Sequence, residues 1–207
     1  MNDVPSVQPT RRPGGLSQRE ILATLGGILA GLVLIGIVYV VSGRNSTPPL
    51  PPLAEVNRPA PQIALPGLDG QMLRLEDYRG RVVLVNFWAT WCEPCKLETP
   101  ALQEAHRQLE AQGLTIIGIN LRKQESDDVV IRAFVDTYGV TYPVVLDVDG
   151  EAARQFQISP IPTSYFIDPA GNIRYVRVGE LTLDEVALVF QSLQQQSTQP
   201  QGSVDGY

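Results

Sequence analysis

The chain contains two cysteines, and both belong to one motif, Cys92-Glu93-Pro94-Cys95. An apolar, strand-like run that ends at Trp88 precedes the motif, and a helix-like segment follows it. The first turn of a helix carries unpaired N–H groups and a partial positive charge, which stabilise a thiolate. We therefore expect Cys92 to be an exposed nucleophile for thiol–disulfide exchange and Cys95 to be the more buried sulfur that resolves the mixed disulfide. Pro94 suits the first helical turn, where its missing N–H is not needed.

Other uses of a cysteine pair fit the sequence less well. A zinc site needs more ligands than two cysteines and one histidine supply. Covalent haem attachment needs a histidine directly after the second cysteine, where this chain has Lys96. A purely structural bridge across so short a loop stabilises little. The pair predicts a redox-active disulfide, with no metal and no further cofactor. His106 is expected on the helix surface, roughly 16 Å along the axis from Cys95.

The segment 62–196 has the pattern of a single α/β domain. Continuous apolar runs at 81–88 and 114–120 are typical of strands buried on both faces. Turn signals separate two hairpins, and apolar stripes at helical spacing lie between the strands. These alternating elements predict a mixed sheet with helices on both faces. The predicted strands are 62–65, 71–75, 81–88, 114–120, 144–146, 163–168 and 173–178, and the predicted helices are 94–112, 127–138, 151–156 and 182–194.

Composition and charge exclude several classes of protein. The chain is 43% hydrophobic and 18% charged, which excludes a wholly disordered chain. Its net charge is −6, whereas a nucleic-acid binder usually presents a basic face, so no nucleic-acid partner is expected. The charge is uneven: residues 1–61 carry +2 and the remainder −8.

Residues 21–41 form an uncharged apolar run. As a helix it spans roughly 31 Å, the thickness of the hydrocarbon core of a bilayer. The run is longer than the apolar region of a cleaved signal peptide, and no good cleavage site follows it, so an uncleaved signal-anchor is favoured over cleavage. Three arginines precede the run and two follow it, which by a narrow margin places residues 1–20 in the cytoplasm and the C-terminal domain outside it.

Two further segments are expected to lie outside the folded domain. Residues 42–61 contain six prolines and are interpreted as an extended linker, because proline favours polyproline II and lacks a backbone donor. The polar tail 197–207 is expected to be disordered.

The sequence around the cysteines resembles a known family. Residues 83–95, Val-Leu-Val-Asn-Phe-Trp-Ala-Thr-Trp-Cys-Glu-Pro-Cys, are similar to the active-site strand and helix of the thioredoxin-like superfamily. Within it they resemble the membrane-anchored TlpA/ResA-like thiol–disulfide oxidoreductases, related to the redoxins. Tyr-Gly-Val at 138–140 and Ser-Pro-Ile-Pro-Thr at 159–163 extend the likeness over about residues 59–195. The resemblance implies a thioredoxin-like fold with an added N-terminal β-hairpin and a central insertion around the helix near 127–138.

The resemblance also implies a substrate-binding surface. Pro162 matches the family's cis-proline, which lies against the cysteine pair and leaves the backbone of Ile161 free to pair with an extended client segment. Pro160 does not match that position and is the less favoured candidate for a cis bond. Trp91 resembles the family's exposed active-site tryptophan, an apolar contact for partners, whereas Trp88 is expected in the core.

The residue that handles the proton is left open by the sequence. Asn86 occupies the strand position where thioredoxin has a buried aspartate. Glu93 lies between the cysteines, where its charge opposes the formation of the thiolate and tunes the couple. Glu125, followed by Ser126, loosely matches a Glu-Ser pair of ResA-like members, and with Pro94 it is a further candidate for tuning the redox couple. A solvated loop residue and a helix cap remain the alternatives for Glu125.

The sequence therefore predicts a membrane-tethered, extracytoplasmic thiol–disulfide oxidoreductase on the periplasmic side of the cell membrane. By resemblance, its clients are exported proteins such as apocytochrome c, and a membrane electron donor of the thiol-reducing type recharges it. One alternative is a thiol peroxidase of the peroxiredoxin-related class, although the Pro-x-x-x-Thr-x-x-Cys pattern is absent because Thr90 lies only two residues before Cys92. Another is a thioredoxin-like interaction module whose cysteines matter little.

Overall fold

The computed structural model describes residues 32–34 and 53–198. The chain divides into two units, 1–48 and 49–207, of which the second holds the α/β domain. Residues 32–34 are helical and exposed; the rest of the predicted signal-anchor, the segment before it, the first part of the linker and the last residues of the tail lie outside the described residues. Among the helices that the structure describes, none has the length and apolar character that a membrane crossing requires.

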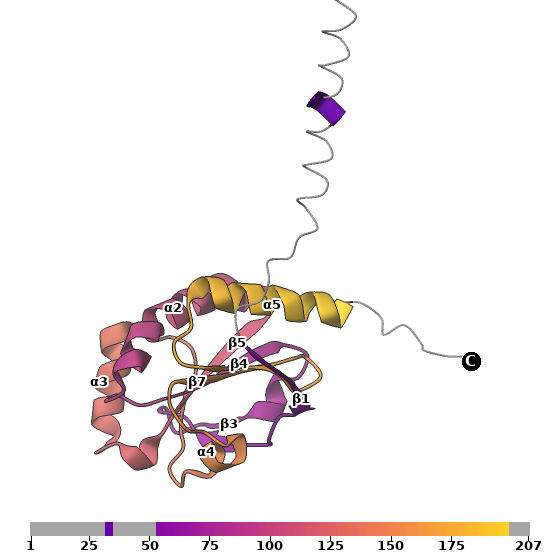
Figure 1. The fold of residues 1–207 in the computed structure, drawn as a ribbon. Coiled ribbons are helices and arrows are strands. Elements are labelled where there is room, and N and C mark those ends of the chain that lie inside the picture. Colours follow the sequence, from indigo (N-terminus) through magenta and orange to yellow (C-terminus); the bar gives the residue numbers. More distant parts are fainter. Residues whose placement is uncertain (1–31, 35–52, 199–207) are drawn as a thin grey trace, which may run out of the picture. The chain divides into compact units, whose positions relative to one another are not determined.

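A six-stranded mixed sheet forms the centre of the domain, in the order β1-β8-β7-β4-β5-β6 (Figure 1). The central strand β4 runs parallel to β5 on one side and antiparallel to β7 on the other. A separate hairpin is formed by β2 and β3. The strands are β1 (Ala54–Pro59), β2 (Ala64–Pro66), β3 (Met72–Arg74), β4 (Val82–Trp88), β5 (Leu114–Asn120), β6 (Val144–Leu146), β7 (Thr163–Ile167) and β8 (Asn172–Val178).

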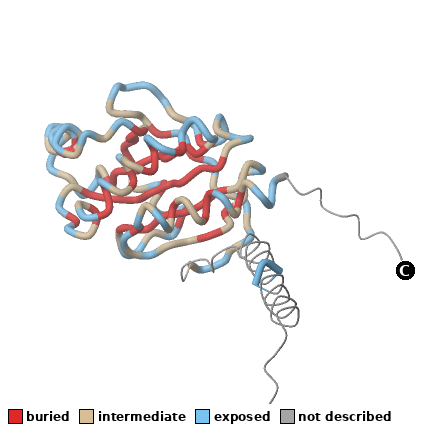
Figure 2. Tube along the Cα trace, turned by 90° about the horizontal axis from the view of Figure 1, so that it is seen from above, coloured by how far each residue is buried: buried red, intermediate tan, exposed pale blue. Residues whose placement is uncertain are grey.

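Helices cover both faces of the sheet, as the alternating elements predict. One buried cluster joins one face of the sheet to α2, α3 and α5, and the other joins the opposite face to α4 and the hairpin. Figure 2 shows the buried residues concentrated in the central strands and in the inner faces of the helices. The helices are α2 (Glu93–Leu109), α3 (Asp128–Tyr138), α4 (Glu151–Phe156) and α5 (Leu183–Thr198), with 3-10 turns η1 (Leu75–Tyr78), η2 (Glu110–Gln112) and η3 (Arg122–Gln124).

The central strands follow directly from their sequences. All seven residues of β4 and all seven of β5 are buried, which is the reason that both appear as unbroken apolar runs. Their parallel pairing aligns Trp88 with Asn120 at the carboxyl end of the sheet. This edge is where ligands and reactive groups gather in α/β folds, and it is where the cysteine motif begins.

The prediction that all of residues 42–61 form a linker is wrong for the C-terminal part of that segment. Residues 54–59 form the edge strand β1, which pairs antiparallel with β8. Proline is tolerated at an edge strand because one side of such a strand needs no donor. The pairing partner lies more than a hundred residues later in the chain, so local composition alone indicated an extended spacer.

His106 is a second correction, because it is buried and not on the helix surface. It lies on the inner face of α2, where its ring packs edge-on against Tyr142 with ring centroids 6.0 Å apart. Its Nε2 is 3.5 Å from a carboxylate oxygen of Glu110. The helical spacing of Leu102, His106 and Leu109 places the imidazole in the apolar stripe that meets the sheet.

Candidate active site

The cysteine motif lies where β4 passes into α2. Cys92 is the N-cap residue of α2, and its Sγ accepts a hydrogen bond from the Cys95 backbone N–H at 3.3 Å. The two sulfurs are joined in a disulfide, with Cα atoms 5.3 Å apart. Pro94 occupies the first turn, as predicted. One sulfur therefore sits at the end of the helix that presents free N–H groups, where a thiolate is stabilised after reduction.

Cys92 is more exposed than Cys95, as expected, but it is far less exposed than the sequence predicted. Cys92 is only 4% exposed and Cys95 is fully buried at 0%, so in the oxidised state neither is openly accessible. The exposed group beside the site is Trp91, at 54%, whose indole N–H donates to the carbonyl of Gln124 at 3.2 Å. Trp88 is in the core as expected, packed against Phe134.

Glu93 is paired with Lys96, one turn further along α2. Its carboxylate accepts a hydrogen bond from Lys96 Nζ at 2.9 Å, and this contact raises the pKa of Lys96 above its ordinary value. The Glu93 side chain is 73% exposed. A neighbouring cation and water both screen its charge, so we expect any effect of Glu93 on a thiolate at Cys92 to be smaller than its position between the cysteines indicates.

Glu93→Gln is expected to raise the fraction of Cys92 that is ionised near neutral pH in the reduced protein, because a negative charge is removed and Lys96 is left unpaired. Exchange should continue, with a rate within about threefold of wild type, because exposed ion pairs are weak. Thiolate absorbance against pH, with a redox titration, measures this. Glu104→Gln is the matched control, since Glu104 pairs with Arg107 at the same spacing on α2. Loss of all exchange with both cysteines intact would contradict this role.

Glu98 is the functional candidate that the sequence interpretation missed. It lies on α2 one turn after Cys95 and is 2% exposed. Its Oε1 accepts from Asn86 Nδ2 at 2.7 Å and its Oε2 accepts from the Leu181 backbone N–H at 3.1 Å. Asn86 Nδ2 also donates to Ser164 Oγ at 2.9 Å, so the amide that replaces thioredoxin's aspartate holds a carboxyl in place.

Burial raises the pKa of Glu98 from its ordinary 4.5 to about 7. The hydrogen bonds from Asn86 and Leu181 oppose this shift, while the charge of Glu180 adds to it. A carboxyl that titrates near neutral pH can both accept and return a proton at working pH. The sequence carried one signal for this role: Glu98 interrupts the buried stripe formed by Cys95, Leu102 and Leu109.

Glu125 is brought to the site by the loop after β5. Its Oε1 accepts from the Thr90 backbone N–H at 2.6 Å and from Asn120 Nδ2 at 3.0 Å, and its Oε2 accepts from Thr90 Oγ1 at 2.6 Å. Thr90 lies two residues before Cys92, so Glu125 fixes the turn from which the cysteine motif starts. Asp127, not Glu125, caps α3 by accepting from Val129 and Val130. Glu125 is instead the C-cap residue of η3, where its backbone N–H donates to the carbonyl of Arg122 at 3.1 Å, so the helix-cap interpretation holds for η3 and not for α3.

Glu125→Ala is expected to lower the free energy of unfolding by about 2–3 kcal/mol, because hydrogen bonds to a charged group are lost at a partly buried turn. Glu125→Gln should cost less, since its amide oxygen still accepts from two N–H groups. Denaturant unfolding and single-turnover exchange measure both effects, and Glu76→Ala on exposed η1 is the control. Wild-type stability and rate in both Glu125 variants would show that the turn is held by other contacts.

The loop that contains Pro162 meets the carboxyl end of β4. Thr163 pairs with Phe87, which places Pro162 next to Trp88 and the turn to Cys92. The Ile161–Pro162 bond is cis, as expected, and the Ser159–Pro160 bond, the less favoured candidate, is also cis. Pro162 is buried and Ile161 is partly buried. The sequence could not indicate the second cis bond, because the resemblance covered only one of the two prolines.

A cysteine pair at the start of the helix that follows a central strand, with a cis-proline loop beside it, defines a thioredoxin-like thiol–disulfide oxidoreductase. The chain belongs to the AhpC/TSA family, whose profile matches residues 56–176.

More narrowly, it belongs with the ResA-type enzymes. It is 34% identical to thiol-disulfide oxidoreductase ResA from Oceanobacillus iheyensis over 163 residues, which are 77% of this chain and 80% of that protein. Among solved structures it resembles a secreted thiol-disulfide isomerase from Corynebacterium glutamicum, with TM-score 0.64, 28% identity and coverage of 72% and 95%. A thiol:disulfide interchange protein from Chlorobium tepidum gives TM-score 0.60, 30% identity and coverage of 68% and 99%.

Proposed function

We propose that this thiol–disulfide oxidoreductase works as a membrane-tethered reductant of disulfides in exported proteins, with its folded domain outside the cytoplasm. The observation that carries the exchange chemistry is the Cys92–Cys95 disulfide at the N-terminus of α2, with a buried carboxyl one turn further on. The uncharged run at 21–41 supports the tether, and the reductive direction rests on what the resemblance of the sequence around the cysteines to ResA-like oxidoreductases implies.

The reaction starts from the reduced protein. The Cys92 thiolate attacks one sulfur of a client disulfide, and the other client sulfur leaves as a thiolate that takes a proton from water. The Cys95 thiol then gives its proton to Glu98 and attacks Cys92 Sγ, so that the bond between Cys92 and the client breaks. The client's second sulfur leaves as a thiolate that takes a proton from water, and Glu98 returns its proton to water. Two electrons have passed to the client, which is now a dithiol, and the Cys92–Cys95 disulfide has formed.

Client binding uses the surface beside the cysteines. An extended client segment pairs with the backbone at Ile161, next to Pro162, and Trp91 supplies an exposed apolar contact. The client class that we propose is exported proteins with cysteine pairs, apocytochrome c among them. A membrane dithiol donor of the thiol-reducing type returns two electrons to the Cys92–Cys95 disulfide, so that no cofactor beyond this disulfide takes part and no nucleic acid is bound.

The reduction potential of the Cys92–Cys95 couple tests the reductive direction. We expect a value more negative than roughly −250 mV, below protein disulfide isomerase at about −180 mV and DsbA at about −120 mV. A potential near that of DsbA would make the protein an oxidant and contradict the proposal. Resistance to carbonate extraction, together with cleavage of the domain by an external protease in cells with opened outer layers, tests the tether separately.

A further inference from the structure

The loop between β8 and α5 is attached at both ends to the proposed site. The Gly179 backbone N–H donates to the carbonyl of Pro162 at 2.9 Å. Two residues later, the Leu181 backbone N–H donates to Glu98 Oε2 at 3.1 Å. Before the loop, Val178 pairs with Thr163, which directly follows Pro162. Residue 180 is therefore fixed between the client-binding loop and the buried carboxyl.

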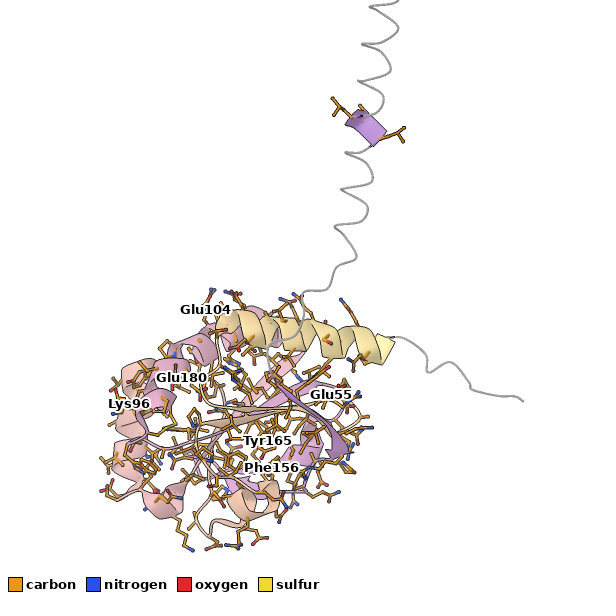
Figure 3. The ribbon with its side chains drawn as sticks, viewed as in Figure 1. Glu55, Lys96, Glu104, Phe156, Tyr165 and Glu180 are labelled. Carbon is orange, nitrogen blue, oxygen red and sulfur yellow. A yellow bond between two sulfur atoms is a disulfide. The ribbon has the colours of Figure 1, made fainter. Side chains whose placement is uncertain are left out.

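Glu180 occupies this position with an exposed side chain. Within the described part of the chain it has no ion-pair partner, whereas Glu93 at the same site is paired with Lys96. The nearby Arg177 donates from Nε to the backbone carbonyl of Glu180 at 3.2 Å, and its guanidinium lies 3.4 Å from the carboxylate of Glu185. Its positive charge lowers the pKa of Glu98 and so opposes the effect of Glu180 there. In Figure 3, Glu180 and Lys96 lie on the same side of the domain, away from Glu55.

The charge of Glu180 acts on the site. It raises the pKa of the buried Glu98 carboxyl, in addition to the larger effect of burial. Glu180 directly follows Gly179, whose N–H is bonded to Pro162, so its exposed carboxylate is carried on backbone beside the loop where the proposed client would pair with Ile161. The neighbouring Val178 is 56% exposed and offers an apolar surface of the kind on which the aliphatic stem of a lysine or arginine packs.

We propose that Glu180 makes the site selective for client disulfides with a basic residue next to the reacting cysteine. This inference rests on the proposed exchange function and names the client class that the site prefers. An exposed ion pair contributes little, so the expected preference is about two- to fivefold in rate for a basic over a neutral flanking residue. A client with an acidic residue at that place should react more slowly than the neutral one.

The test uses the full chain, reduced beforehand and freed of reductant. Three synthetic peptides carry the same Cys-Gly-Ala-Cys disulfide and differ only in the residue before the first cysteine, which is Lys, Gln or Glu. Single-turnover rates at low salt should follow the order Lys, Gln, Glu. E180Q should make the three rates nearly equal, and E180K should reverse their order. E55Q, which removes one charge from β1, should keep the wild-type order. Salt at about 1 M should remove the order in wild type, because the Debye length falls to about 3 Å.

The outcomes separate this inference from the function on which it rests. Reaction with none of the three peptides would overturn the exchange function itself. Reaction at equal rates with all three, or an unchanged order in E180Q, would overturn the role of Glu180 while leaving exchange intact. A second readout does not depend on the differences between the peptides. The exchange rate measured against pH should show a midpoint that belongs to Glu98, and this midpoint should lie at lower pH in E180Q and stay unchanged in E55Q.

Discussion

Cys95→Ser is expected to stop the reaction at a covalent protein–client disulfide through Cys92, and Cys92→Ser is expected to abolish exchange. Cys92 is the N-cap residue of α2 and the slightly more exposed sulfur, whereas Cys95 is fully buried, so that only Cys92 can meet a client first. Without Cys95, the mixed disulfide has no internal thiol to resolve it. Non-reducing electrophoresis and mass spectrometry of the adduct measure this result.

The expected loss in the Cys92 variant is larger than for any other single change, because the one remaining thiol, Cys95, is fully buried and cannot meet a client. Ser differs from Cys by one atom, so circular dichroism of both variants should match that of wild type treated with reductant. Normal turnover by the Cys95 variant would contradict the two-cysteine mechanism. It would favour an interaction module, or chemistry at Cys92 alone as in a peroxidase.

Glu98→Gln is expected to remove the pH dependence of exchange near neutrality. In wild type, the rate of the step that uses Cys95 should rise as Glu98 loses its proton around pH 7. The amide of Gln cannot accept the proton, so the rate above this pH should fall by on the order of 10²-fold, the usual contribution of a general base. Single-turnover rates from pH 5 to pH 9 measure the effect, and Glu104→Gln, at a partly exposed position of α2, should keep the wild-type profile.

The same carboxyl makes stability depend on pH. Its pKa is higher in the folded protein than in the unfolded chain, so protonation stabilises the fold, and that contribution is lost as pH rises through about 7. Between pH 5 and pH 9, wild type should lose up to about 3 kcal/mol relative to Glu98→Gln. At pH 5 the variant should be less stable, because its NH₂ group faces a donor from either Asn86 or Leu181. A constant stability difference across this range would show that Glu98 stays in one protonation state.

The elements that position the cysteines could be predicted from local pattern. Two uninterrupted apolar runs indicated β4 and β5, and Pro94 after Cys92 marked the beginning of α2. The hairpin and the inserted helix α3 also followed from turn and stripe signals. These features depend on residues close in sequence. The spacing of apolar residues and the residue types found in turns predict local elements of this kind.

Features that depend on distant pairing could not be predicted in this way. β1 becomes a strand only because β8 offers it an edge. Glu125 reaches Thr90 only because β5 lies beside β4 and ends at the same edge of the sheet. Glu98 was visible in the sequence as a charge in an apolar stripe, but its partners Asn86 and Leu181 come from two other parts of the chain.

The most direct test of the account is one turnover of the reduced full-length protein with a disulfide peptide, followed by acid quenching and mass spectrometry. We expect each peptide disulfide that is reduced to be matched by one Cys92–Cys95 disulfide formed, with a transient adduct through Cys92. A peptide that stays oxidised, or one that is reduced no faster than by a free dithiol and without a Cys92 adduct, would contradict it.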